Sequence, residues 1–330
     1  MTSSVAIPQA GDLGAVQHRW GDLGDIELRE QARRASEKLD LEELWQLTLW
    51  HLTTSGRKGD AVSPNTIANY QRAIADLVHW CKQNNRRPHS LKARDTGLYR
   101  SWLQREGGSV AGTKAKPDGE PYSKPLSPAS VNLRLAGARR LLGALIATEA
   151  RRTPDPFARV AVHDPTPSHS KREGYSDAEY SAMVAACRGP RELALILLGG
   201  EAGLRASELT GLTWEQCDLS GRILEVIGKG NKKRQVPISS RCRDAMRELY
   251  QEDGRPPKSV PVFCLCRQRV HGLVTRIAQS AQVPKRGVHS LRHRAGTRWY
   301  ALLKDLVEVA RIMGHSDPST ARIYVHRGAR

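Results

Sequence analysis

The sequence predicts a mostly α-helical protein with one small β-sheet, divided into two domains. The chain has 330 residues, enough for two domains that each bury a core. Apolar side chains recur at helical spacing over most of its length, whereas the alternation typical of strands is confined to residues 222–238. No apolar run approaches the ~20 residues of a membrane-spanning helix, and the N-terminal residues do not resemble a secretory signal. We therefore expect a cytoplasmic protein.

The first domain is predicted to be all-helical, spanning residues 36–150 after a flexible leader over residues 1–35. Leucines among good helix formers predict a helix over residues 28–52. Ser63-Pro64 and Ser127-Pro128 each place a capping serine before a proline that suits the first helical turn. A helix is therefore expected to begin at each of these two pairs.

The end of the first domain contains two predicted irregular segments. Residues 107–125 are rich in Gly, Pro and Lys and are expected to form a loop after a helix over residues 95–105. Residues 151–172 include four prolines, each of which restricts its own backbone and that of its predecessor. This segment is expected to be the linker between the domains.

The second domain, residues 173–330, is predicted to be helical apart from a β-hairpin. Ser176 and Glu179 have the spacing of a capping box that starts a helix. The expected later elements are a buried helix over residues 193–198, strands over 222–227 and 234–238, and helices from about residue 269 onward.

Charge indicates the class of partner. The formal net charge is +18 and the isoelectric point is about 10.0. Residues 1–60 carry ten acidic and seven basic side chains, so the positive excess lies in the rest of the chain. Such a field favours a nucleic acid, through neutralised phosphates and released counterions, over a basic surface without a dedicated ligand. The six scattered cysteines fit reduced thiols better than a disulfide scaffold.

Four short segments of the second domain carry side chains suited to phosphodiester chemistry. They are Gly203-Leu204-Arg205-Ala206-Ser207-Glu208, Gly228-Lys229-Gly230, His289-Ser290-Leu291-Arg292-His293, and Gly314-His315-Ser316 followed by Tyr324. Guanidinium groups can hold phosphate oxygens bidentately. The sequence has no clustered carboxylate motif of the kind that holds magnesium in metal-dependent nucleases.

The order of these residues resembles the tyrosine recombinase (phage integrase) family. The family pattern of Arg, Lys, His-x-x-Arg, His and Tyr is met in AGLRASELTGLTW, VIGKGNKKRQVPI, HSLRHRAG and MGHSDPSTARIYVH. Tyr324 follows His315 by nine residues, as the resemblance leads one to expect. The match covers residues 173–326 and is most similar to the Xer-like or simple phage-integrase type. By pattern alone, residues 36–150 resemble the family's helical core-binding (SAM-like) domain, which makes residues 173–330 the catalytic domain.

The resemblance implies a mechanism and a role for each residue. Tyr324 would attack the scissile phosphate, giving a 3′-phosphotyrosyl bond and a free 5′-hydroxyl. Arg205 and Arg292 would clamp the nonbridging oxygens, and Lys229 would protonate the leaving oxygen. His289 and His315 would assist proton transfer, and Glu208 would orient Arg205. No metal, ATP or other cofactor is implied.

The resemblance also implies partners. These are double-stranded DNA with paired core half-sites and a homotetramer that exchanges strands through a Holliday junction, with room for an accessory factor that sets direction. Integration, excision or resolution of a mobile element or replicon would be the outcome. The protein would associate with the nucleoid when bound to DNA. Basic residues expected to contact DNA outside the catalytic centre are Lys232, Lys233, Arg234, Arg134, Arg139 and Arg140, with Arg86 and Arg87 as further candidates.

Alternatives remain open at this point. Tyr324 alone could be a packing residue, and Arg205 could form only an ion pair with Glu208. His289 with His293, or Cys264 with Cys266, could bind a metal. For the whole chain the alternatives are a type IB topoisomerase-like enzyme that relaxes supercoils, and a DNA-binding regulator that keeps the fold without the chemistry.

The segment after Tyr324 is shorter than the resemblance leads one to expect. Six residues follow Tyr324, whereas the resemblance implies a longer tail that docks on a neighbouring protomer. We therefore expect another surface to couple the protomers. The leader is short and acidic, which favours a recombinase acting on short core sites over one with an arm-binding domain.

Overall fold

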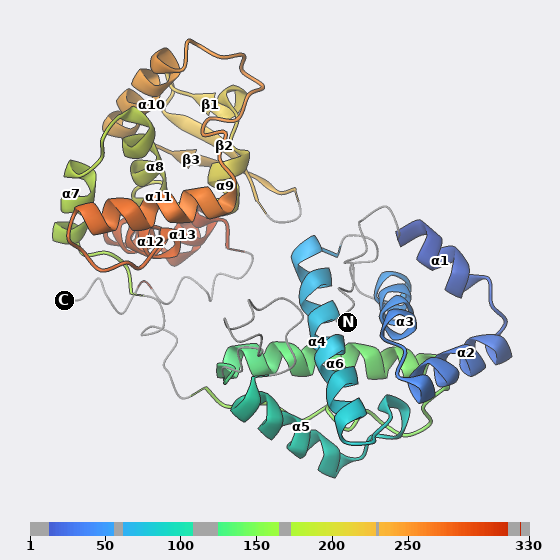
Figure 1. The fold of residues 1–330 in the computed structure, drawn as a ribbon. Helices are drawn as coiled ribbons and strands as arrows, with labels where there is room; N and C mark the ends of the chain where they lie inside the picture. The colour runs from blue at the N-terminus through green and yellow to red at the C-terminus, as the bar shows by residue number, and fades with distance from the viewer. Residues whose placement is uncertain are drawn as a thin grey trace, which may run out of the picture. The chain divides into compact units, whose positions relative to one another are not determined.

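The computed structural model describes residues 13–55, 62–107, 125–164, 173–228, 231–315 and Tyr324. It divides into two compact units, residues 1–165 and 166–330 (Figure 1), and each is described here by itself. The division falls inside the segment predicted as the linker. Among the described residues, no helix is both long and apolar enough to cross a membrane.

The first unit is helical, as predicted. Its elements are α1 (Leu13–Gly21), α2 (Asp25–Lys38), α3 (Leu41–Thr54), α4 (Pro64–Gln83), the 3-10 helix η3 (Pro88–Ser90), α5 (Ala93–Glu106) and α6 (Pro128–Ala147). Helices α4 and α6 pack directly on each other (Figure 1), and a Cβ atom added at Gly137 of α6 would lie 2.3 Å from Cβ of Ala73 on α4. Leu77 and Leu135 are fully buried in the core that these helices share.

Both Ser-Pro start signals are confirmed. The Ser63 hydroxyl accepts a hydrogen bond from the Thr66 N–H, and the Ser127 hydroxyl accepts one from the Ser130 N–H. The single helix expected over residues 28–52 is instead two helices. Leu39 takes a left-handed conformation with φ 53°, and the Asp40 carboxylate caps α3.

Two segments predicted to be irregular pack onto the first unit. Residues 13–35 are not a flexible leader, because they form α1 and most of α2 and bury Trp20 completely. Residues 151–164 of the expected linker follow α6 and bury Phe157. An apolar aromatic residue in each segment gives it a place in the core, a contact that composition alone does not reveal. Residues 165–172 and 108–124 lie outside the described residues.

The second unit surrounds a buried helix, α8, with further helices and a small sheet. Its helices are α7 (Asp177–Ala185), α8 (Pro190–Gly200), α9 (Ala206–Gly211), the 3-10 helix η4 (Trp214–Gln216), α10 (Ser240–Glu252), α11 (Arg267–Ser280), α12 (Val288–Leu303) and α13 (Leu306–Met313). Helix α8 contains the predicted buried run, and its residues from Ala194 onward are buried. The capping box of Ser176 and Glu179 is present at the start of α7.

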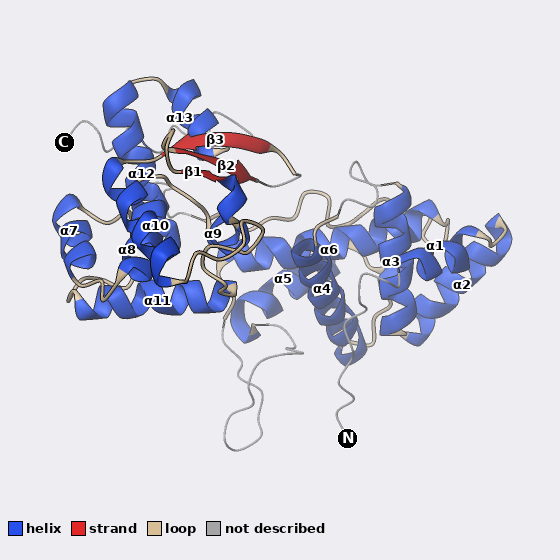
Figure 2. Cartoon of the chain, turned by 90° about the horizontal axis from the view of Figure 1, so that it is seen from above, coloured by secondary structure: helices blue, strands red, loops and turns tan. Residues whose placement is uncertain are grey.

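The sheet is antiparallel, with strand order β1-β2-β3 (Figure 2). Strands β2 (Ile223–Ile227) and β3 (Lys233–Pro237) are the predicted pair, and Val226 faces Arg234 across them. The short strand β1 (Cys217–Asp218) was not predicted. Helix α13 lies beside β3 (Figure 2). This places β3 next to the carboxyl end of α13, where His315 follows.

Candidate active site

Arg205 and Glu208 form the start of α9 and bind each other closely. Gly203, with φ +76°, turns the chain between α8 and α9, and Arg205 is the N-cap residue of α9. The Arg205 N–H donates to Oε2 of Glu208 at 2.8 Å, and its Nη1 donates to Oε1 at 2.7 Å. The side chain of Glu208 is 3% exposed, whereas that of Arg205 is 34% exposed. The Arg205 side chain is therefore partly open to solvent.

Arg292 lies on α12 and is buried. Its Nη1 donates to the Gly203 carbonyl at 2.5 Å, its Nη2 donates to the Met313 carbonyl, and Nη1 lies 3.8 Å from Oε2 of Glu208. Burial lowers the pKa of Arg292 to about 10, and the charge of Arg205 acts in the same direction. Arg292 is thus a buried cation beside a second guanidinium, a suitable arrangement for binding an anion.

The structure places Arg234 differently from the expected DNA contact. Its side chain on β3 is 9% exposed and donates from Nη1 and Nη2 to the two carboxylate oxygens of Glu208, each at 2.9 Å. Its neighbours Lys232 and Lys233 are exposed, and Lys233 forms an ion pair with Glu225 at 2.9 Å. Arg234 is therefore part of the cluster around Glu208, and its position one residue after the lysines gave no signal of this.

Glu208 is the shared acceptor of this cluster. Burial alone would raise its pKa, but the hydrogen bonds and charges of Arg234 and Arg205 outweigh burial and hold the pKa at about 2. The carboxylate is therefore ionised throughout the neutral range and holds the two arginines in fixed positions.

His315 and Tyr324 meet at the end of α13. Gly314 (φ +64°) ends the helix, and its carbonyl accepts a hydrogen bond from Arg205 Nη2 at 2.8 Å. The Tyr324 hydroxyl lies 3.5 Å from Nε2 of His315, and the two ring centroids are 5.9 Å apart. Burial lowers the pKa of His315 to about 4, as do the charges of Arg292 and Arg205. His315 is therefore neutral near pH 7 and can accept a proton.

Tyr324 is buried but close to the arginine cluster. The residue is 2% exposed, and its ring packs on α12, where a Cβ atom added at Gly296 would lie 2.3 Å from that ring. Burial raises the pKa of Tyr324, while the charges of Arg292 and Arg205 act in the opposite direction. The phenol is thus neutral near pH 7 and shielded from solvent in this position.

A cavity of about 170 Å³ opens beside the two arginines. It is lined by Arg205, Ala206, Ser207, Arg267, His271, Val288, His289 and Arg292. The predicted residue His289 is therefore in the site and exposed to solvent, and its ring packs against His293 with centroids 4.9 Å apart. Arg267 and His271 were not predicted; they lie one turn apart on α11, a spacing that places them on a common helix face.

Lys229 lies outside the described residues. Its neighbour Gly228 is described, and the Gly228 N–H donates to the Lys232 carbonyl at 2.8 Å. A Cβ atom added at Gly228 would lie 3.4 Å from Arg234 Nη1 and 3.8 Å from Oε1 of Glu208. The chain therefore passes beside the cluster immediately before Lys229.

The basic residues of the first unit have different surroundings. Arg134 forms an ion pair with Asp76 at 2.5 Å, and both side chains are largely buried. Arg139 donates from Nε to the Phe157 carbonyl at 2.8 Å and from Nη2 to the Val160 carbonyl. Arg140 is exposed. Of these three, Arg140 keeps the accessibility that a phosphate contact requires; the roles of all three in DNA binding stay predictions.

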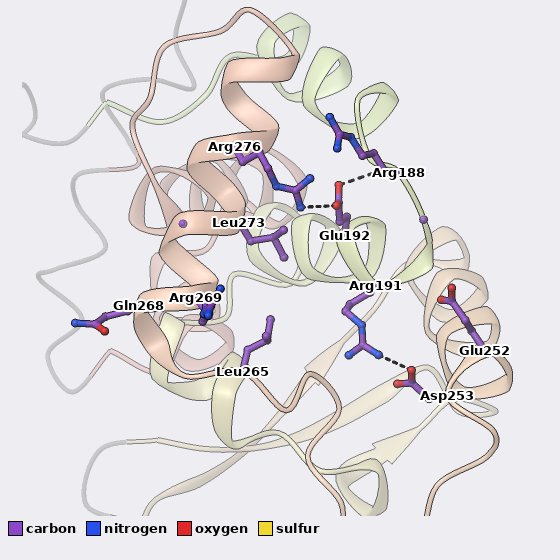
Figure 3. Close-up of a pocket in the computed structure, with 12 residues that line it drawn as sticks. Arg188, Arg191, Glu192, Glu252, Asp253, Leu265, Gln268, Arg269, Leu273 and Arg276 are labelled. Carbon is purple, nitrogen blue, oxygen red and sulfur yellow. Dashed lines mark hydrogen bonds and ion pairs between the residues drawn. The ribbon is translucent and has the colours of Figure 1, made fainter.

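A second cavity, of about 600 Å³, lies among α8, α10 and α11 (Figure 3). Two of its arginines already have carboxylate partners: Arg191 binds Asp253, and Arg276 binds Glu192 at 2.6 Å. None of the predicted site residues lines it. The cavity with Arg205 and Arg292 is therefore the better candidate for the reaction.

Known proteins similar in sequence to this chain are tyrosine recombinases. The family model of the phage integrase family matches residues 176–330. The tyrosine recombinase XerD of Vibrio cholerae is 30% identical over 283 residues, which cover 80% of this chain and 86% of the relative. The tyrosine recombinase XerC of Xanthomonas campestris is 27% identical, covering 80% of this chain and 79% of the relative.

Solved structures match the fold. XerH recombinase bound to a palindromic difH substrate has a TM-score of 0.63 at 17% identity and covers 98% of this chain and 94% of that chain. The Tn1549 transposon integrase in complex with transposon right end DNA has a TM-score of 0.60 at 18% identity, covering 85% of this chain and 94% of that chain. The two-domain, mostly helical fold is therefore shared with these DNA-bound proteins.

Proposed function

The chain belongs to the phage integrase family of tyrosine recombinases, enzymes that cut and rejoin DNA at specific sites, and on this premise we propose that it cleaves DNA with Tyr324 as the nucleophile. The observation that carries the proposal is the convergence of Tyr324, His315, Arg205 and Arg292 at one place in the second unit. Separate segments of the sequence supply these side chains, and each has the chemistry that one step needs.

In the cleavage step, the Tyr324 oxygen bonds to phosphorus while the bond between phosphorus and the 5′-oxygen breaks. The phenolic proton passes to Nε2 of His315, which is neutral and lies 3.5 Å from the hydroxyl in the DNA-free structure. Lys229 supplies a proton to the leaving 5′-oxygen, and His289 assists from the cavity wall. The products are a 3′-phosphotyrosyl bond and a free 5′-hydroxyl.

The arginines stabilise the charge that develops on the phosphate. A guanidinium has five N–H donors. Arg205 uses Nη1 for Glu208 and Nη2 for Gly314, so further N–H groups remain for nonbridging oxygens. Arg292 likewise uses Nη1 and Nη2 for two carbonyls and keeps further donors. Positioned cations of this kind contribute most where they face the transition state.

Rejoining reverses the chemistry. The 5′-hydroxyl of a partner strand attacks the phosphotyrosine, and one phosphate ester replaces another, so neither ATP nor another energy source is required. Exchange of one strand from each of two duplexes gives a Holliday junction held by a homotetramer on paired half-sites, and exchange of the second pair of strands resolves it. A palindromic substrate, which contains inverted half-sites, is bound by the similar XerH protein. The proposed biological outcome is integration, excision or resolution of a mobile element or replicon.

A nicked suicide substrate tests the proposal. Cleavage next to the nick releases a short fragment that carries the attacking hydroxyl, so the covalent complex accumulates. Wild type should form it and Tyr324→Phe should not, and mass spectrometry should locate DNA on the peptide that contains Tyr324. No covalent complex, or equal trapping by the variant, would overturn the proposal and favour a DNA-binding regulator. Relaxed supercoils without exchange between two sites would favour a topoisomerase.

A further inference from the structure

We propose that Arg234 is a positioning residue, which fixes Glu208 and the end of α13 and thereby holds Arg205 and Arg292 in the geometry that binds the scissile phosphate. This inference rests on the proposed function. It replaces the expected contact between Arg234 and the DNA backbone with a role inside the protein.

The hydrogen bonds of Arg234 occupy all three of its nitrogens. Nη1 and Nη2 each donate to a carboxylate oxygen of Glu208 at 2.9 Å, and Nε donates to the Ile312 carbonyl at 2.9 Å. The paired contact with Glu208 is the bidentate form that a guanidinium makes and an ammonium cannot. With 9% of its side chain exposed, Arg234 is poorly placed to contact DNA itself.

The carboxyl end of α13 binds three arginines in succession. The Ile312 carbonyl accepts from Arg234, the Met313 carbonyl from Arg292, and the Gly314 carbonyl from Arg205. The last carbonyls of a helix have no partner within the helix and carry partial negative charge. They therefore hold the three guanidiniums from one side, and Glu208 contacts the same three from another.

Gly314 allows this close approach. Its φ of +64° favours glycine, and a Cβ atom there would lie 2.8 Å from Cζ of Arg234. Gly228, one residue before Lys229, also borders Arg234: a Cβ atom added there would lie 3.4 Å from Arg234 Nη1. Arg234 thus joins β3 to α9 and α13, and His315 follows directly after this junction.

Substitution of Arg234 should have a different effect from substitution of Arg205 or Arg292, because it removes no group that binds the phosphate. Without it, Glu208 would keep Arg205 but lose two charge-assisted hydrogen bonds, and the end of α13 would lose one. The phosphate-binding arginines would still be present but less precisely held. We therefore expect the chemical step to slow while DNA affinity, which depends on many phosphate contacts, changes little.

The test compares Arg234→Met with Gln235→Met, a matched control at the adjacent exposed position of β3. Single-turnover cleavage of the suicide substrate is measured at saturating DNA, with affinity and thermal unfolding measured alongside. Arg234→Met should slow cleavage on the order of 100-fold, and Gln235→Met should stay within about twofold. Arg234→Lys keeps the charge but cannot reproduce the paired contact, so its cleavage rate should lie between those of wild type and Arg234→Met. If Arg234→Met does not fold, Arg234→Lys takes its place in the comparison with Gln235→Met.

A second substrate distinguishes a defect in positioning the phosphate-binding arginines from a general loss of structure in the Arg234 variants. It carries a methylphosphonate at the scissile position, so one nonbridging oxygen and its negative charge are absent. If Arg234 acts through the phosphate-binding arginines, the defect of its variants should shrink about tenfold or more on this substrate. An equal defect on both substrates, an unchanged cleavage rate, or a loss explained by weaker DNA binding would overturn the inference.

The outcomes also distinguish this inference from the proposed function. If wild type traps DNA on Tyr324 and Arg234→Met behaves like wild type, only the role of Arg234 fails. If wild type traps no DNA, or if Tyr324→Phe traps it equally well, the proposed function fails and Arg234 has no phosphate chemistry to position.

Discussion

The hydroxyl oxygen of Tyr324 lies 3.5 Å from Nε2 of His315, and this pair sets the expected pH dependence of cleavage. His315 has a pKa of about 4, lowered by burial and by Arg292 and Arg205, so its neutral, proton-accepting form persists well below pH 7. Arg292 has a pKa of about 10, lowered by burial and by Arg205, and so stays charged through the neutral range. At subsaturating DNA, the second-order rate constant for cleavage should therefore show no acid limb from His315 until the pH approaches 4, where its ring becomes protonated.

The control for this prediction is His315→Gln, which keeps a hydrogen-bonding side chain at that position but cannot titrate. The variant should cleave more slowly than the wild type at every pH. Its pH profile should lack the fall in rate at acidic pH that protonation of His315 causes in the wild type. An acid limb near the ordinary histidine pKa of about 6.5 that is present in the wild type and absent from His315→Gln would contradict the prediction.

Glu208→Gln should destabilise the second unit, because three guanidiniums would lose their shared negative charge. Breaking a buried ion pair by removing one partner costs about 3–5 kcal/mol. The folded-state pKa of about 2 lies below the ordinary value of 4.5, so the stabilisation is present above pH 4.5 and is lost as the pH falls towards 2. Urea unfolding from pH 7 to pH 3 should therefore show a gap between wild type and variant that narrows with acid. A constant gap would contradict the assigned ionisation of Glu208.

Much of the fold was predictable because its signals are local. Ser63, Ser127 and Ser176 cap the helices that they were expected to begin, and the apolar run in α8 is buried. The break between α2 and α3 was missed because Leu39 adopts a left-handed backbone that leucine rarely takes. The packing of Phe157 was missed because its contacts lie far along the chain: its carbonyl accepts a hydrogen bond from Arg139, 18 residues earlier.

The candidate site was predictable where a motif carries the chemistry. Arg205, Arg292, His315 and Tyr324 stand in the order of the family, and the fold brings them together. Arg234 was predicted to contact DNA because it follows two lysines just after the tip of the hairpin. Its partners, Glu208 and Ile312, lie 26 and 78 residues away along the chain. Contacts at such separations come from tertiary packing rather than from a local pattern.

Gly296→Ala should expel the Tyr324 ring from its position on α12. An added Cβ atom would lie 2.3 Å from the ring, while alanine itself favours the helix by about 1 kcal/mol over glycine. Nitration of the DNA-free protein, followed by peptide mass spectrometry, should show Tyr324 modified faster in the variant than in wild type. Gly272→Ala on α11, where an added Cβ atom meets nothing within 4 Å, is the matched control. Equal nitration of Tyr324 in both variants would contradict its burial against Gly296.

Chelation should leave cleavage unchanged. Arg205 and Arg292 already place positive charge at the candidate phosphate site, which is the contribution that a divalent cation makes in metal-dependent nucleases. The suicide-substrate rate in excess EDTA, with sodium adjusted to constant ionic strength, should match the rate without EDTA. Loss of cleavage on chelation, with recovery on adding magnesium, would show that the arginines do not suffice.

Arg139 and Arg140 are neighbours on α6 with different expected roles. Arg139 bonds to the carbonyls of Phe157 and Val160, so Arg139→Met should lower the free energy of unfolding by about 1–3 kcal/mol through lost hydrogen bonds. Arg140 is exposed, so Arg140→Met should change stability by at most about 0.5 kcal/mol. If Arg140 contacts a phosphate, its variant should weaken DNA binding and reduce the salt dependence of log Kd by about one unit, and Arg139→Met should not. Urea unfolding and binding titrations at several salt concentrations separate the two effects, and a reduced salt slope for Arg139→Met alone would reverse the assignment.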